Sequence, residues 1–306
     1  MDKGKHRQSL YGNGCRLMEL LSSYTFLIVA IGTTILSFAA GVIGTVSVIK
    51  GQSLIGDAIG HATFPGVILA FMLIGVTDTL PLTIGAIIFG VIAFFFIQLI
   101  TNHSKVTLDG ALALILSSFF GFGMALKSYV QGNPGFSNTQ GIDDYIFGQA
   151  AYMLRLDVWL IIIASVASLL LFLIFYQQIR IYTFDPVYSS TIGINPALVN
   201  VLVLSMTILL IAVGLKAVGA ILIVNLLIAP GVIGLLWSNR FNIVLLIAGL
   251  SGAVSAFIGT YISTAYAGFA TGPSIILVMS IIVFISMMFG RRGIITRKFN
   301  LRGDAT

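Results

Sequence analysis

The sequence between two long apolar runs reads Gly51-Gln52-Ser53-Leu54-Ile55-Gly56-Asp57-Ala58-Ile59-Gly60-His61-Ala62-Thr63-Phe64-Pro65-Gly66. Asp57 and His61 are four residues apart, so a helix places both side chains on one face, one turn from each other. A carboxylate inside a bilayer costs about 2.5–3.5 kcal/mol on insertion scales, so an ionisable group there indicates a functional site. The pair offers an oxygen and an imidazole nitrogen, both of which are ligands for divalent metal ions.

The composition is that of a polytopic membrane protein. The chain has 306 residues, of which 58% are hydrophobic and only 8% are charged, whereas soluble domains carry about 25% charged residues. A single cysteine, Cys15, excludes a disulfide framework and a cysteine-based zinc site. The net charge of +6 lies mostly towards the two ends of the chain, which suits lipid headgroups better than nucleic acid.

Apolar runs long enough to cross a bilayer recur along the whole chain. The predicted spans are about 26–49, 53–76, 80–101, 108–127, 157–176, 197–214, 217–237, 242–264 and 272–290. This pattern predicts an all-α protein with eight or nine transmembrane helices, since the tight connection at Gly214-Leu215-Lys216 would also fit a re-entrant segment. We therefore expect a basic, surface-lying tail (1–22), a transmembrane domain (23–290) and a second basic tail (291–306).

The distribution of lysine and arginine predicts the sidedness of the protein. The basic C-terminal tail is placed in the cytoplasm, and counting back through nine spans brings Lys50, Lys105, Arg180 and Arg240 to the same side. The other side then receives Lys127, Arg155, Lys216 and the basic N-terminal tail, and this tail is an exception to the rule.

The connection from Gln177 to Pro196 carries the signals of a short helix. Asp185 suits an N-cap, Pro186 suits the first helical position, and Gly193 follows the end, so we expect about two turns over 185–192. On the predicted topology this segment faces the cytoplasm, where it could dock a partner. An ordinary interhelical loop is the alternative interpretation.

Three interpretations of Asp57 and His61 are open on the residues alone: a metal site, a local ion pair and a proton relay. Two ligands do not fill a metal shell, because a divalent ion takes four to six donors or more. A twofold homodimer would double the set. Asn225 and Pro230 lie in another span, where Asn usually joins helices and Pro kinks them, and a role in lining a transport path is the less favoured interpretation.

The sequence resembles the membrane permease subunit of bacterial manganese/zinc/iron ABC importers. Residues 56–66 fit that family's Gly-Asp-x-x-x-His-x-x-x-Pro-Gly pattern, and the resemblance extends over about 26–290. Further matches, in order along the chain, are Tyr145-Ile146-Phe147-Gly148, Thr183-Phe184-Asp185-Pro186 through Gly193, Val218-Gly219-Ala220-Ile221-Leu222 to Pro230, and Thr271-Gly272-Pro273.

The resemblance implies a homodimeric permease of the bacterial cytoplasmic membrane, served by two cytoplasmic ATPase chains and an extracytoplasmic metal-binding protein. The chain itself has no Walker A motif, so ATP hydrolysis is expected on a separate chain and no catalytic residue is expected here. Asp57 and His61 would be metal ligands in the path, and no permanently bound cofactor is implied. Residues that would couple to the ATPase are Asp185, Pro186, Val187, Tyr188 and Gly193.

The expected cargo is a divalent transition-metal ion, manganese first, with zinc and iron as alternatives. Other functions that we considered are a permease for a larger metal chelate such as a siderophore or cobalamin, a proton-coupled transporter, and an intramembrane sensor or enzyme. We expect lipid, and no nucleic acid, among the partners.

Overall fold

The computed structural model describes residues 24–133, 136, 153–266 and 269–293. Within these ranges, nine segments are long and apolar enough to cross a bilayer, which agrees with the predicted all-α protein of eight or nine spans. The tail 1–22, residues 294–306 of the second tail and the match at Tyr145–Gly148 lie outside the described residues.

The helices follow the apolar runs closely. Their bounds are α2 Tyr24–Ile49, α3 Leu54–Ala62, α4 Phe64–Ile74, α5 Thr79–His103, α6 Leu108–Gly132, α8 Arg155–Ile174, α9 Tyr176–Phe184, α10 Pro186–Thr191, α11 Pro196–Val218, α12 Ala220–Trp237, α13 Phe241–Ala265 and α14 Thr271–Phe289.

Two connections differ from the sequence-based expectation. The turn expected at 214–216 lies at Gly219, because α11 continues through Lys216 and buries Ala217 and Val218 before it ends. The segment expected as a loop after residue 176 is helix α9, which buries Ile179, Tyr182 and Thr183 on one face. In both cases tertiary burial extends a helix into residues whose local pattern is weak.

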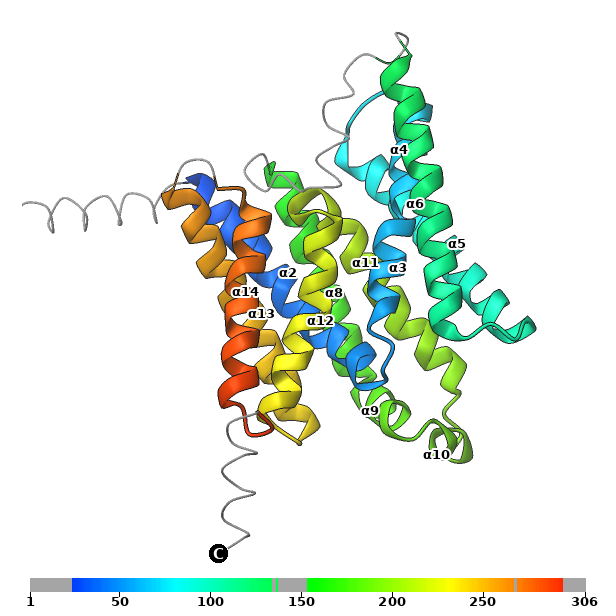
Figure 1. Cartoon of the computed structure of the whole chain (residues 1–306), viewed down its shortest axis with the longest axis vertical. Coiled ribbons are helices and arrows are strands. Elements are labelled where there is room, and N and C mark those ends of the chain that lie inside the picture. Colours follow the sequence, from blue (N-terminus) through cyan, green and yellow to red (C-terminus); the bar gives the residue numbers. More distant parts are fainter. Residues whose placement is uncertain (1–23, 134–135, 137–152, 267–268, 294–306) are drawn as a thin grey trace, which may run out of the picture.

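The helices form two groups with α3 and α11 between them (Figure 1). In one group α2 packs against α8, α12 and α13, and α14 packs against α12 and α13; in the other, α4, α5 and α6 pack against one another. Helix α3 contacts α4, α5 and α6 on one side and α11 and α12 on the other. The helix that carries Asp57 and His61 therefore lies at the junction of the two groups.

Helix α2 packs against α12 and α13 at positions that admit no side chain. A Cβ on Gly44 would overlap the backbone carbonyl of Leu227 in α12, and a Cβ on Gly252 of α13 would lie 2.6 Å from the carbonyl oxygen of Ser37 in α2. Small residues at such crossings let helix backbones approach closely in membranes. We call α2, α12 and α13 the close-packed frame.

The two ends of the bundle differ in charge. Helices α9 and α10 and the last turn of α14 lie at one end, here called the α10 end, and the first turn of α2 lies at the opposite, far end (Figure 1). The described basic residues at the α10 end are Lys50, Lys105, Arg180, Arg240, Arg291 and Arg292. Those at the far end are Lys127, Arg155 and Lys216. This arrangement is the one that the predicted topology requires.

Candidate functional site

The hydrogen-bond ladder of the span that carries the candidate site is interrupted in its middle. Helix α3 ends at Ala62 and α4 begins at Phe64, although together they form one apolar span, Leu54–Ile74. Pro65 has no N–H to donate to the carbonyl of His61, so the regular ladder of helical hydrogen bonds is interrupted there. Thr63, between the two helices, keeps right-handed helical angles (φ −73°, ψ −21°), so the backbone stays helical past His61 with one hydrogen bond missing.

A tight turn fixes the start of α3. The N–H of Gln52 donates to the carbonyl of Ser47 at 2.8 Å, and the N–H of Gly51 donates to that of Val48 at 3.1 Å. Gly51 has φ +68°, a conformation that favours glycine. These bonds form a Schellman motif, so the end of α2 holds α3 in a defined position.

Asp57 and His61 lie together, one turn apart, as their spacing predicts. The Nε2 atom of His61 is 3.4 Å from Oδ1 of Asp57, and the two side chains are 23% and 34% exposed, respectively. The His61 ring stands edge-on to Phe120 of α6, with ring centroids 5.0 Å apart. Its Nδ1 atom is buried and has no hydrogen-bond partner within the described ranges. Packing, rather than a second hydrogen bond, therefore orients the imidazole.

An adjacent face of α3 is closed by α12. A Cβ on Gly56 would lie 3.2 Å from Cδ1 of Leu227, and one on Gly60 would lie 3.1 Å from Cγ2 of Val224. Within the part of the chain that the structure describes, no three His, Cys, Asp or Glu side chains gather as a possible metal site. One copy thus presents a two-donor site whose side chains are still partly accessible.

The expected short helix is α10, Pro186–Thr191. The side chain of Asp185 accepts a hydrogen bond from the N–H of Tyr188 at 2.8 Å, as an N-cap does. Gly193, with φ +84°, follows the end of the helix. Val187 and Tyr188 are 75% and 54% exposed. A one-to-two-turn helix with an exposed apolar surface therefore lies at the α10 end.

The other two candidates lie in α12. Asn225 is half-buried and makes no hydrogen bond or ion pair with Asp57 or His61 as far as the described residues go. Pro230 is buried, and a Cβ on Gly41 of α2 would lie 3.1 Å from its own Cβ. Pro230 thus has the contacts of a residue that packs α12 against α2.

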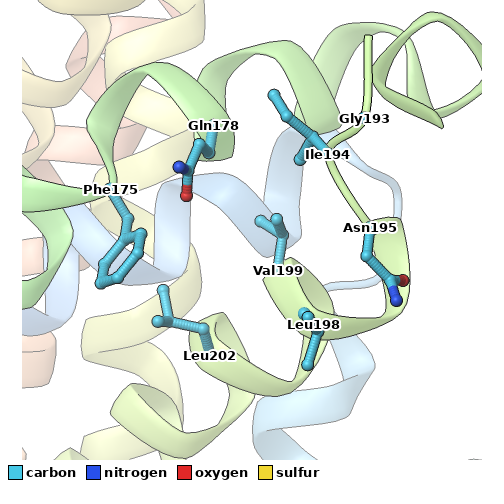
Figure 2. A pocket seen from close by; sticks show the side chains of 8 residues that line it. All are labelled: Phe175, Gln178, Gly193, Ile194, Asn195, Leu198, Val199 and Leu202. Carbon is cyan, nitrogen blue, oxygen red and sulfur yellow. The ribbon is translucent and has the colours of Figure 1, made fainter. Parts of the chain in front are cut away.

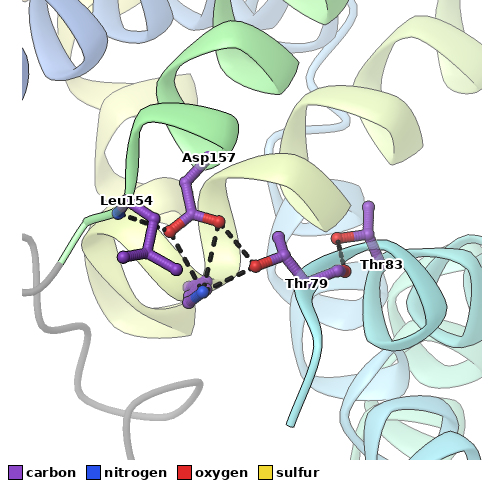
Figure 3. Close-up of polar contacts among 5 residues, drawn as sticks. Thr79, Thr83, Leu154 and Asp157 are labelled. Atoms are coloured by element: carbon purple, nitrogen blue, oxygen red, sulfur yellow. Dashed lines mark hydrogen bonds and ion pairs between the residues drawn. The ribbon is translucent and has the colours of Figure 1, made fainter.

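A polar cluster that was not predicted from the sequence lies at the far end (Figure 3). Nζ of Lys216 lies 3.0 Å and 3.1 Å from the two carboxylate oxygens of Asp157, and it donates to Oγ1 of Thr79 at 2.6 Å. Thr79 donates to Asp157 at 2.5 Å, and the N–H of Leu154 also donates to that carboxylate. A lysine inside an apolar run is the one signal that could have indicated this cluster.

A second lysine contact lies at the α10 end. Lys50, which follows α2, donates a hydrogen bond to the hydroxyl of Tyr182 in α9. Its Nζ atom also lies 3.7 Å from the centroid of that ring, a cation–π geometry. The aromatic partner lies far away in the sequence, and no local pattern points to it.

Comparison with known proteins gives the same family from sequence and from structure. The ABC 3 transport family matches residues 23–290. The chain is 36% identical to the zinc transport system membrane protein TroC of Treponema pallidum over 287 residues, which cover 94% of this chain and 96% of TroC. It is 37% identical to the manganese transport system membrane protein MntC of Bacillus subtilis over 271 residues, 88% of this chain and 62% of that protein.

The solved structure of PsaBC from Streptococcus pneumoniae in complex with Fab superposes with a TM-score of 0.82 at 27% sequence identity, covering 94% of this chain and 99% of the matched one. The family match over most of the chain and the 36% identity to TroC along nearly its whole length lead to one conclusion: this chain is a membrane permease that belongs to the ABC 3 transport family.

Proposed function

We propose that this chain is the permease subunit of an ATP-driven importer of divalent transition-metal ions, with manganese as the cargo. In this proposal two copies form the path, two cytoplasmic ATPase chains drive it, and an extracytoplasmic metal-binding protein delivers the ion. The α10 end faces the cytoplasm of a bacterium, in keeping with its basic residues.

The observation that carries the proposal is the partly exposed Asp57–His61 pair on a broken span. An exposed carboxylate at this depth would be costly against lipid, so its open side faces water or another protein surface. Because Nε2 of His61 and Oδ1 of Asp57 are 3.4 Å apart, each side chain keeps a lone pair that can bind a metal ion. A second copy, related by twofold symmetry, would bring a matching acid and imidazole, and water would complete the shell.

The donor set bears on the choice of metal. Carboxylate oxygen and imidazole nitrogen without thiolate suit Mn²⁺ and Fe²⁺ as well as Zn²⁺. Affinity alone favours zinc over manganese, so selectivity would come from site geometry and from the delivery protein. The similar relatives include one named for zinc and one named for manganese, and we propose manganese with zinc and iron as the competitors to test.

The exposed surface of α10 supports the ATPase part of the proposal. Val187 and Tyr188 leave apolar area uncovered on a helix whose ends are fixed by Asp185 and Gly193. Such a surface would dock in a groove of the ATPase chain, and Asp185 and Pro186 would keep the helix preformed.

The experiment is manganese uptake by the purified permease–ATPase complex in proteoliposomes, loaded through the delivery protein. We expect Asp57→Ala and His61→Ala each to lower uptake at least about tenfold, because a ligand is lost from a shared site. Asp109→Ala and His103→Ala are matched controls, since they remove the same chemical groups from exposed positions.

Two results would contradict the proposal. One is a double variant, Asp57→Ala with His61→Ala, that imports manganese at the wild-type rate. The other is wild-type uptake that neither excess zinc nor excess iron reduces but that an intact metal chelate does, which would favour a chelate permease.

A further inference from the structure

Helix α9 leads directly into α10, so a displacement of one moves the other. Only Asp185 separates Phe184 from Pro186. Its N–H donates to the carbonyl of Ile181 in α9 at 2.9 Å, and its carbonyl accepts from the N–H of Ser189 in α10 at 3.0 Å. A partner that pushes α10 would therefore also shift α9.

Tyr182 is the residue through which α9 touches the end of α2. Its ring is 6% exposed, its hydroxyl accepts from Lys50, and the Lys50 ammonium stands over its face. Burial lowers the pKa of Lys50 to about 8 and raises that of Tyr182, so the contact excludes much of the surrounding water. Cation–π contacts are stronger when desolvated.

Lys50 is in turn joined to the helix of the metal pair by two routes. Through the chain, the hydrogen-bonded turn at 50–52 leads into α3 at Leu54. Through packing, Leu227 of α12 meets Gly44 of α2 with its backbone and Gly56 of α3 with its side chain. The end of α2, the close-packed frame and α3 are thus one mechanically continuous unit.

A pocket adjoins the face of α9 that carries Tyr182, because Phe175 and Gln178 precede Tyr182 by seven and four residues and so share its side of the helix. A cavity of about 280 Å³ lies between α9 and the start of α11 (Figure 2). Its lining residues are Phe175, Gln178, Gly193, Ile194, Asn195, Leu198, Val199 and Leu202. Few atoms fill this space, so α9 has room towards α11 next to its contact with Lys50.

We propose that Lys50 and Tyr182 are positioning residues that carry the displacement of α10 to the helix bearing Asp57 and His61. This inference rests on the proposed function, because it assigns the contact to the coupling of ATP hydrolysis to metal import. Neither residue touches the metal pair, and their part is to move the unit that holds it.

The test is the ratio of manganese imported to ATP hydrolysed by the reconstituted permease–ATPase complex. We expect Lys50→Met to lower this ratio about five- to tenfold, within the range of coupling energies between sites. Tyr182→Phe keeps the ring and loses the hydroxyl, so it should lower the ratio about two- to threefold. Lys50→Arg keeps the cation and its donors, so the ratio should stay within about twofold of wild type.

Tyr176→Phe is the matched control. It also removes a hydroxyl from α9, but that hydroxyl donates to Asn242 of α13 and not to the end of α2. Manganese binding without nucleotide should be equal for wild type and all four variants, because a purely structural defect would change this binding as well as the ratio. If Lys50→Met does not assemble, Tyr182→Phe decides the question.

A second readout needs no transported metal. In a Cys15→Ser background, the labelling rate of Leu54→Cys at the exposed start of α3 should change with nucleotide, and Lys50→Met should abolish the change. Unaltered ratios and unaltered nucleotide response in both Lys50→Met and Tyr182→Phe would overturn the inference. A wild-type complex that shows the nucleotide response but imports no manganese would overturn the proposed function and leave the coupling contact standing.

Discussion

Two lysines join helices at opposite ends of this permease, and they do so by different chemistry. At the far end Lys216 contacts both oxygens of the buried carboxylate of Asp157. At the α10 end Lys50 faces the ring and hydroxyl of Tyr182, and no carboxylate pairs with it in the described portion of the chain.

This difference separates a fixed end from a movable one. Removing one partner from a buried ion pair leaves an uncompensated charge in a low-dielectric environment, so such a pair resists separation. A lysine on an aromatic ring pairs with no opposite charge and keeps a flexible side chain, so the contact can stay formed while the segments that it joins change position. The charge chemistry therefore predicts that α5, α8 and α11 stay joined at the far end, while α9 and the end of α2 move together at the other.

The largest effect on stability is expected from removing one partner of the ion pair at the far end. Asp157→Ala leaves Lys216 without its counter-ion and Leu154 without an acceptor, and should lower the free energy of unfolding by about 3 kcal/mol, at the lower edge for buried pairs because Lys216 keeps some solvent contact. Thermal unfolding in detergent measures this. Asp109→Ala, which removes an exposed carboxylate, is the control, and equal melting temperatures for the two variants would refute the idea of a fixed end.

A smaller loss should follow from removing only the hydroxyl at the far end. Thr79→Val keeps the shape but takes away the donor to Asp157 and an acceptor for Lys216, which should cost about 1.5–3 kcal/mol because the partners are charged. Tyr182→Phe should cost only about 1 kcal/mol or less, since the variant loses one hydrogen bond and keeps the contact between the ring and Lys50. If chemical unfolding ranks the two variants in the reverse order, the contrast between the ends is wrong.

Replacing the whole far-end pair should be milder still than breaking it. The double variant Asp157→Leu with Lys216→Met should have a free energy of unfolding within about 1 kcal/mol of that of wild type, because a well-packed apolar pair often replaces a buried ion pair without loss of stability. A double variant as unstable as Asp157→Ala would show that the hydrogen bonds to Leu154 and Thr79, rather than the charges, hold the far end.

The smallest effect concerns pH at the α10 end. The pKa of Lys50 falls from 10.5 to about 8 in the folded protein, so between those values the unfolded chain binds more protons and stability rises with pH. The stability of wild type relative to Lys50→Met should therefore increase from about pH 8 to pH 10.5, by about 1 kcal/mol or less because solvent screens the group. A flat difference over that window would mean that Lys50 is fully hydrated.

Most of the fold could be predicted because bilayer thickness dictates the length of an apolar helix. The Asp57–His61 pair could also be predicted from the sequence, since its four-residue spacing is local. The polar contacts across the bundle were not: Lys216 and Asp157 are 59 residues apart, and Lys50 and Tyr182 are 132 apart. Such contacts depend on how helices cross, and helix α9 itself forms because Ile179 and Tyr182 find a surface to bury against.

The crossing of Gly44 with the backbone of Leu227 has a practical consequence. An interface that cannot accept one methyl group cannot slide by one residue either, because Ile43 or Thr45 would then enter the space of Gly44. The separation of these two segments should then be invariant through the transport cycle. Spectroscopic labels attached to the outer surfaces of α2 and α12 would give a constant reference distance, against which the displacement of other helices can be measured.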